Sequence, residues 1–131
     1  MTQLWQPVTP PGSTPDQALL TRLASEAESL LSGQPLVTET ADIQAIEGWL
    51  NQPADAWLTW LQPLSTEQQL NLAIFFTAAE EQISHWQCGS QNPAIIIFRA
   101  LKKQGSLPDK SRIRSIKALT SNRYIPYGAA V

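Results

Sequence analysis

Apolar residues recur at helical spacing between Ser65 and Cys88, and this stretch carries the clearest structural signal in the chain. Its large apolar side chains follow one another at intervals of three and four residues, which gathers them into one arc of a helix. A second apolar row on another side predicts contacts with neighbours in two directions, so we expect this helix at the centre of a bundle. The first row contains Leu72, Phe75, Phe76, Ala79, Ile83 and Trp86, and the second contains Leu70, Ile74 and Ala78.

Capping and stop signals divide the rest of the chain into further helices. Ser65 followed by Gln68 has the capping-box pattern, and Asn92 followed by Pro93 is typical of a helix start. Gly105 is the expected stop of that later helix. The predicted helices cover residues 14–33, 40–52, 53–61, 65–88, 93–104 and 109–120.

The predicted fold class is all-α. We expect a compact bundle of five to six helices, with residues 14–131 forming a single helical domain. Residues 1–13 are rich in proline and predict an extended N-terminal arm. The end of the chain, after residue 120, is expected to be an irregular tail that is tied down by its apolar residues.

The number of cysteines and the lengths of the apolar runs exclude several classes of protein. One Cys excludes an internal disulfide framework, and a single Cys with a single His excludes zinc sites of the usual spacing. No apolar run approaches the roughly 18 to 20 residues that span a membrane, and residues 1–15 lack the pattern of a signal peptide. We therefore expect a cytoplasmic protein with no cofactor and no membrane contact.

Charge is distributed unevenly, although the formal net charge is only −2. Residues 1–98 contain one base and ten acids, a formal charge of −9, whereas residues 99–131 contain eight bases and one acid, a formal charge of +7. Such asymmetry is typical of a chain whose basic end meets an anionic partner. It is equally compatible with a solvated basic face, or with basic helices that face the acidic helices of the same bundle.

The bases of the C-terminal part form the candidate binding site. Lys110, Arg114 and Lys117 recur at intervals of four and three residues, so they form one stripe roughly 90 to 100° from the apolar side of their helix. Such a surface, with tyrosines beside it, suits an acidic protein or a phosphate backbone. The candidate residues are Arg99, Lys103, Lys110, Arg114, Lys117, Arg123, Tyr124 and Tyr127.

Three classes of function remain open. The sequence favours a non-catalytic protein-interaction module, whose partner is another protein or a second copy of the chain. The alternative is a nucleic-acid-binding protein that uses helices 93–104 and 109–120. These helices match a helix-turn-helix unit poorly, because Ser111 and Arg114 stand where the second helix should be apolar. The third class is a ligand-binding or enzymatic domain with a pocket beside the tryptophan-rich segment 49–60.

Catalytic and metal-binding motifs are absent from the sequence. It contains no phosphate loop, nucleophile elbow or zincin motif. Glu81, His85 and Cys88 could share one side of the central helix, but nothing in the sequence supplies the oxyanion donors that a nucleophile needs. We expect no catalytic residue and no metal ligand. The tryptophans Trp49, Trp57 and Trp60 are expected to fill the core.

Overall fold

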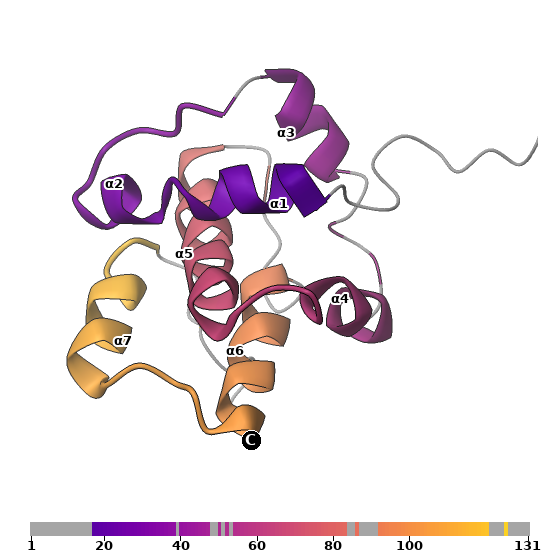
Figure 1. The fold of residues 1–131 in the computed structure, drawn as a ribbon. Helices are drawn as coiled ribbons and strands as arrows, with labels where there is room; N and C mark the ends of the chain where they lie inside the picture. The colour runs from indigo at the N-terminus through magenta and orange to yellow at the C-terminus, as the bar shows by residue number, and fades with distance from the viewer. Residues whose placement is uncertain are drawn as a thin grey trace, which may run out of the picture.

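The computed structural model describes residues 17–38, 40–47, 50, 52, 54–83, 86, 92–120 and 125. Within these residues all regular structure is helical, as the sequence predicts (Figure 1). The predicted N-terminal arm and most of the C-terminal tail lie outside the described residues. The helices are α1 (Gln17–Ala24), α2 (Ala27–Leu31), α3 (Thr40–Glu47), α4 (Ala54–Leu61), α5 (Thr66–Gln82), α6 (Pro93–Gln104) and α7 (Lys110–Lys117).

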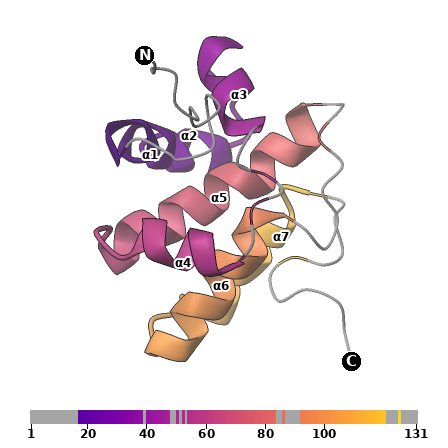
Figure 2. The same cartoon turned by 90° about the vertical axis from the view of Figure 1, so that its right-hand side faces the viewer.

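Helix α5 lies at the centre of the bundle, which confirms the prediction. The predicted capping box is present: the Gln68 backbone N–H donates to Ser65 Oγ at 3.1 Å, and the Ser65 N–H donates to Gln68 Oε1 at 3.0 Å. Helices α1 and α2 pack on one side of α5, and α6 packs on the opposite side (Figure 2). Helix α7 also contacts α5. The two predicted apolar rows account for these contacts, since nearly all of their residues are buried.

Helix α5 ends at Gln82, so the prediction of a helix to Cys88 was too long. The backbone of Ile83 is already extended, with φ −99° and ψ 102°. Trp86 is buried although it follows the helix, and its Nε1–H donates to Glu47 Oε2 at 2.8 Å. A tertiary contact to the end of α3, rather than helical periodicity, therefore brings Trp86 into the core.

The predicted helix over residues 14–33 is interrupted in the structure. Helix α1 ends at Ala24 and α2 begins at Ala27, with a turn at Ser25 and Glu26 between them. The Ser25 hydroxyl donates to the carbonyl oxygen of Arg22, a local bond that competes with helical hydrogen bonding. With α1 and α2 counted as one interrupted helix, the part of the chain that the structure describes contains six helical elements, within the predicted range.

Helix α6 begins and ends where the sequence predicts. The side chain of Asn92 accepts a hydrogen bond from the Ala94 N–H at 2.7 Å, and Gly105 adopts the left-handed conformation at φ 73°. The helix runs antiparallel to α5 and packs on both α5 and α4 (Figure 2). Its first two turns are buried almost all round, because these two neighbours cover different sides of it.

The aromatic residues of α4 belong to the core. Trp57 is 0% exposed, and its ring packs edge-on against Trp60 and Phe76, with ring centroids 4.9 and 5.4 Å away. This arrangement confirms the prediction that Trp57 fills the interior. Trp49 lies outside the described residues.

Gln69 is a buried polar side chain that connects three helices. Its Nε2 donates to the carbonyl oxygens of Leu61 and Leu64, at 3.1 and 3.2 Å. Gln104 donates to its Oε1 at 3.4 Å. The Leu61 carbonyl oxygen at the end of α4 also accepts from the Leu64 N–H at 2.9 Å, so Gln69 gives it a second donor. Gln69 also provides a donor for the Leu64 carbonyl in the connection that follows α4. The end of α4, the start of α5 and the end of α6 are thereby held together.

We predict that Gln69→Leu lowers the free energy of unfolding by about 1–3 kcal/mol, because buried carbonyls lose a donor. Gln62→Leu is the matched control, since Gln62 is exposed in the connection after α4, and we expect a change within about 0.5 kcal/mol. Chemical denaturation followed by circular dichroism measures both variants. Equal effects of the two substitutions would contradict the role assigned to Gln69.

Candidate functional site

The predicted site residues fall into three groups in the structure. Three exposed side chains lie on α7: Lys110, Arg114 and Lys117. Two exposed side chains lie on α6: Arg99 and Lys103. Three residues lie outside the described part of the chain: Arg123, Tyr124 and Tyr127. The group on α7 lines a common groove that Arg99 and Lys103 do not line, so the structure brings together part of the predicted set.

This groove, which we call the α7 groove, has a volume of about 500 Å³. Three cations and three less polar residues line it: Leu107, Pro108, Lys110, Ile113, Arg114 and Lys117. The cations share one face because they stand at positions i, i+4 and i+7 of the helix. The connection that follows α6 supplies Leu107 and Pro108. The groove therefore combines positive charge with an apolar lining.

The cations of the α7 groove have no charged partner within the described residues. The side chains of Lys110, Arg114 and Lys117 form neither an ion pair nor a hydrogen bond in that part of the chain. An ion pair instead joins α1 to α3, between Arg22 Nη2 and Asp42 Oδ2 at 3.2 Å. The described acidic helices of the same molecule thus do not neutralise these three charges.

Helix α7 contacts α5 more than it contacts α6. It presents Ile116 as its buried residue, and Asp109 caps its first turn by accepting from the Arg112 N–H at 2.9 Å. In a helix-turn-helix unit the second helix enters the major groove while the first crosses the backbone. A second helix that packs mainly on α5 provides no support for a unit built from α6 and α7.

Arg112 differs from the other bases of α7. It is partly buried, it does not line the groove, and its Nε is buried without a hydrogen-bond partner in the described residues. Helical geometry places it about 200° from both Lys110 and Arg114, on the side of the buried Ile116. Its charge therefore lies away from the α7 groove.

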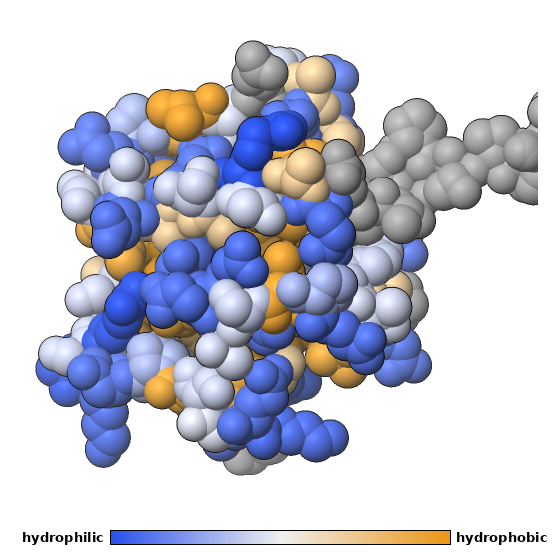
Figure 3. All heavy atoms as spheres, viewed as in Figure 1, coloured by the Kyte–Doolittle hydropathy of each residue, from blue (hydrophilic) through white to orange (hydrophobic). Residues whose placement is uncertain are grey.

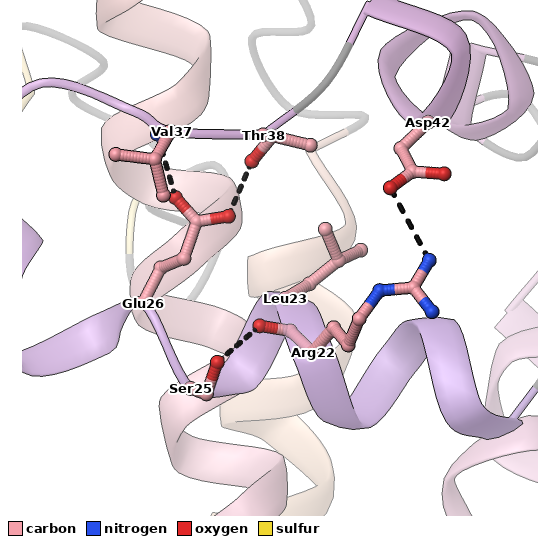
Figure 4. Close-up of a pocket in the computed structure, with 7 residues that line it drawn as sticks. All are labelled: Arg22, Leu23, Ser25, Glu26, Val37, Thr38 and Asp42. Atoms are coloured by element: carbon pink, nitrogen blue, oxygen red, sulfur yellow. Dashed lines mark hydrogen bonds and ion pairs between the residues drawn. The ribbon is translucent and has the colours of Figure 1, made fainter.

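A second pocket, of about 380 Å³, lies beside the turn between α1 and α2 (Figure 4). The Glu26 carboxylate accepts hydrogen bonds from the Val37 backbone N–H at 3.0 Å and from the Thr38 hydroxyl. Two carboxylates face one guanidinium, so the lining carries a formal charge of −1. Its residues are Arg22, Leu23, Ser25, Glu26, Val37, Thr38 and Asp42.

The sequence pattern does not predict this pocket. Glu26 is partly buried, and its carboxylate accepts a hydrogen bond from the Val37 N–H. Its position in the apolar pattern instead predicts a solvated carboxylate that points outward. No local motif indicates that a carboxylate in the turn between two helices will bind a backbone N–H eleven residues later. The apolar lining of the α7 groove was also missed, but a signal exists for it. Pro108 and Ile113 flank the cap Asp109 at the two positions of a hydrophobic staple.

Segment 34–38 is held in place by two side chains. Gln82 of α5 accepts from the Leu36 N–H at 2.8 Å and donates to the Gln34 carbonyl oxygen at 3.3 Å. Glu26 holds Val37 in the way just described. Exposure alternates along the segment, as in an extended chain: Pro35 and Val37 are exposed, while Leu36 and Thr38 are partly buried.

The described residues contain no cluster of three or more His, Cys, Asp or Glu side chains suited to a metal ion. His85 and Cys88, which the sequence placed near Glu81, lie outside these residues. None of the helices in this part of the chain combines the length and the apolarity needed to cross a bilayer. Comparisons with protein-family models, with curated proteins and with solved structures found no match.

We predict that Glu26→Ala accelerates hydrogen exchange of the Val37 amide, because this N–H loses its acceptor. A hydrogen bond to a charged group contributes roughly 1.5–3 kcal/mol, so we expect an increase of about tenfold or more. The Leu36 amide is an internal control, since Gln82 remains its acceptor. Exchange measured by NMR distinguishes the two amides. An unchanged Val37 rate would contradict the anchoring role of Glu26.

Proposed function

We propose that this protein is a non-catalytic interaction module whose α7 groove binds an acidic protein segment carrying an apolar side chain. One observation carries the proposal: exposed cations without a charged partner in the described residues line the same groove as apolar side chains. Carboxylates of a partner would find their counterions at the rim. An apolar side chain of the same partner would be removed from water against Leu107, Pro108 and Ile113.

The apolar lining favours a protein over a nucleic acid as the partner. Burying apolar surface contributes about 25 cal/mol per Å², and a phosphate backbone offers no such surface to the groove. No aromatic side chain on which a base could stack is among the lining residues. The cations alone would attract phosphate as well as carboxylate, so nucleic acid is the rival that the experiment must separate.

We also propose that the protein acts in the cytoplasm. A chain with one cysteine contains no disulfide framework, and it needs no oxidising compartment for its stability.

We predict that the protein binds a labelled acidic peptide with central leucine and valine residues more tightly than a peptide with serine at those two positions. Fluorescence anisotropy at about 50 and 200 mM salt measures both affinities, and a labelled DNA duplex serves as a third probe. We expect Lys117→Glu to weaken binding of the apolar acidic peptide roughly three- to tenfold, because a rim charge typically contributes up to about 1 kcal/mol.

Lys102→Glu is the matched control for this variant. It makes the same change in net charge, and both lysines lie in the last turn of a helix, so the two reversals perturb the helix dipole similarly. Lys102 does not line the α7 groove, and we expect its reversal to leave peptide affinity nearly unchanged. Tighter binding of the duplex with a steep salt dependence would overturn the proposal in favour of nucleic acid. Absence of peptide binding at either salt concentration would also overturn it.

A further inference from the structure

Val37 is the most exposed large hydrophobic residue in the described part of the chain, at 78% exposure. On the face shown in Figure 3, hydrophobic atoms lie mostly in recesses between hydrophilic side chains. A single exposed apolar side chain is common on protein surfaces. Val37 is unusual because its backbone is fixed. The Val37 N–H donates to the Glu26 carboxylate, and the neighbouring Leu36 N–H donates to the Gln82 side chain.

A fixed backbone matters for binding. Ordering a flexible loop at an interface opposes association, whereas a segment already held in its bound conformation avoids most of that loss. Pro35 and Val37 are the exposed apolar residues of segment 34–38, and they form what we call the Val37 ridge. The ridge is therefore preorganised to present two apolar side chains to a concave, apolar surface.

The surroundings of the Val37 ridge carry the charge opposite to that of the α7 groove. The pocket beside Val37 contains Glu26 and Asp42 against a single Arg22. The same contrast holds for the whole chain, since residues 1–98 carry a formal charge of −9 and residues 99–131 carry +7. Ridge and groove thus match in two respects, because each places apolar side chains next to charge and the two charges are opposite.

We infer that the partner of the α7 groove is the Val37 ridge of a second copy of this chain, with Glu26 and Asp42 of the adjoining pocket as its acidic groups. This inference rests on the proposed function of the groove and names its occupant. Segment 34–38 lies between α2 and α3, whereas the α7 groove is lined by residues from Leu107 to Lys117. The contact therefore joins two different surfaces, and the ridge of one copy meets the groove of another. The assembly is a symmetric dimer with two reciprocal contacts, a ring or an open filament.

Sedimentation velocity over a range of concentrations tests self-association of the full chain. We expect the weight-average sedimentation coefficient to rise with concentration and the rise to be smaller at about 200 mM than at about 50 mM salt. We expect two variants to remain monomeric in isolation: Val37→Asp, which removes the ridge, and the double variant Arg114→Glu with Lys117→Glu, which reverses the groove. Leu58→Asp is the control, because Leu58 is the other exposed large hydrophobic residue of the described chain, at 42%.

Mixing the two monomeric variants supplies the decisive measurement. The intact groove of the Val37→Asp chain can still receive the intact ridge of the groove variant, so the equimolar mixture should form a dimer that grows no further. Circular dichroism of each variant establishes that it is folded. A mixture that stays monomeric, or a Leu58→Asp chain as impaired as Val37→Asp, would overturn the inference.

A monomeric wild-type chain at millimolar concentration and low salt would also overturn it. The peptide experiment then separates this failure from that of the proposed function. If the acidic peptide binds the α7 groove of a strictly monomeric chain, the groove has a partner other than a second copy. If the peptide does not bind either, both proposals are wrong.

Discussion

Complete burial of the middle of α5 is the constraint on which the remaining structure depends. Every residue from Leu72 to Ala79 is buried, and the one polar side chain among them, Thr77, donates to the Ala73 carbonyl oxygen at 2.8 Å. A helix that is apolar all round must be covered all round. The other helices supply that cover: α1 and α2 on one side, α6 on the opposite side and α7 along part of its length. The position of the α7 groove follows from the part of α5 that α7 covers.

Helix α7 contributes least to this cover, and its surface is correspondingly free. Ile116 is its one fully buried residue, and burying an isoleucine stabilises by about 1.5–3 kcal/mol. The exposed positions of such a helix need only be polar for folding. Folding alone does not require that three of these exposed positions be bases on one face, next to an apolar groove. Arg114 and Lys117 of α7, like Lys102 and Lys103 of α6, lie in the last turn of their helix and complement its dipole. The bases of α7 differ in that they also line an apolar groove.

Local signals in the sequence predicted the helix boundaries well, and distant contacts caused the errors. The capping box of Ser65 and Gln68 and the stop at Gly105 involve neighbours along the chain, so they can be identified from the sequence. The early end of α5 and the anchoring of segment 34–38 depend on partners that lie further along the chain. Trp86 bonds Glu47, and Glu26 bonds Val37, and neither pairing has a sequence signature.

The candidate site shows the same division between local and distant information. Helical spacing alone predicted that Lys110, Arg114 and Lys117 share a face. The sequence also grouped Arg99 and Lys103 with them, because these residues are close along the chain. In the structure α6 packs on α4 and α5, and its bases do not line the α7 groove. Proximity in sequence is a poor guide to a shared surface when each helix packs on a different neighbour.

Charge segregation along the chain overstates the acidity of the surface that the Val37 ridge presents. Carboxylates of the N-terminal part are partly used inside the fold: Glu26 holds segment 34–38, Glu47 bonds Trp86, and Glu80 bonds the buried Asn92 at 2.6 Å. The α7 cations have no such internal use among the described residues. In the proposed contact the acidic side is therefore the weaker electrostatic partner. Burial of the ridge must then supply most of the affinity, while the charges set orientation and association rate.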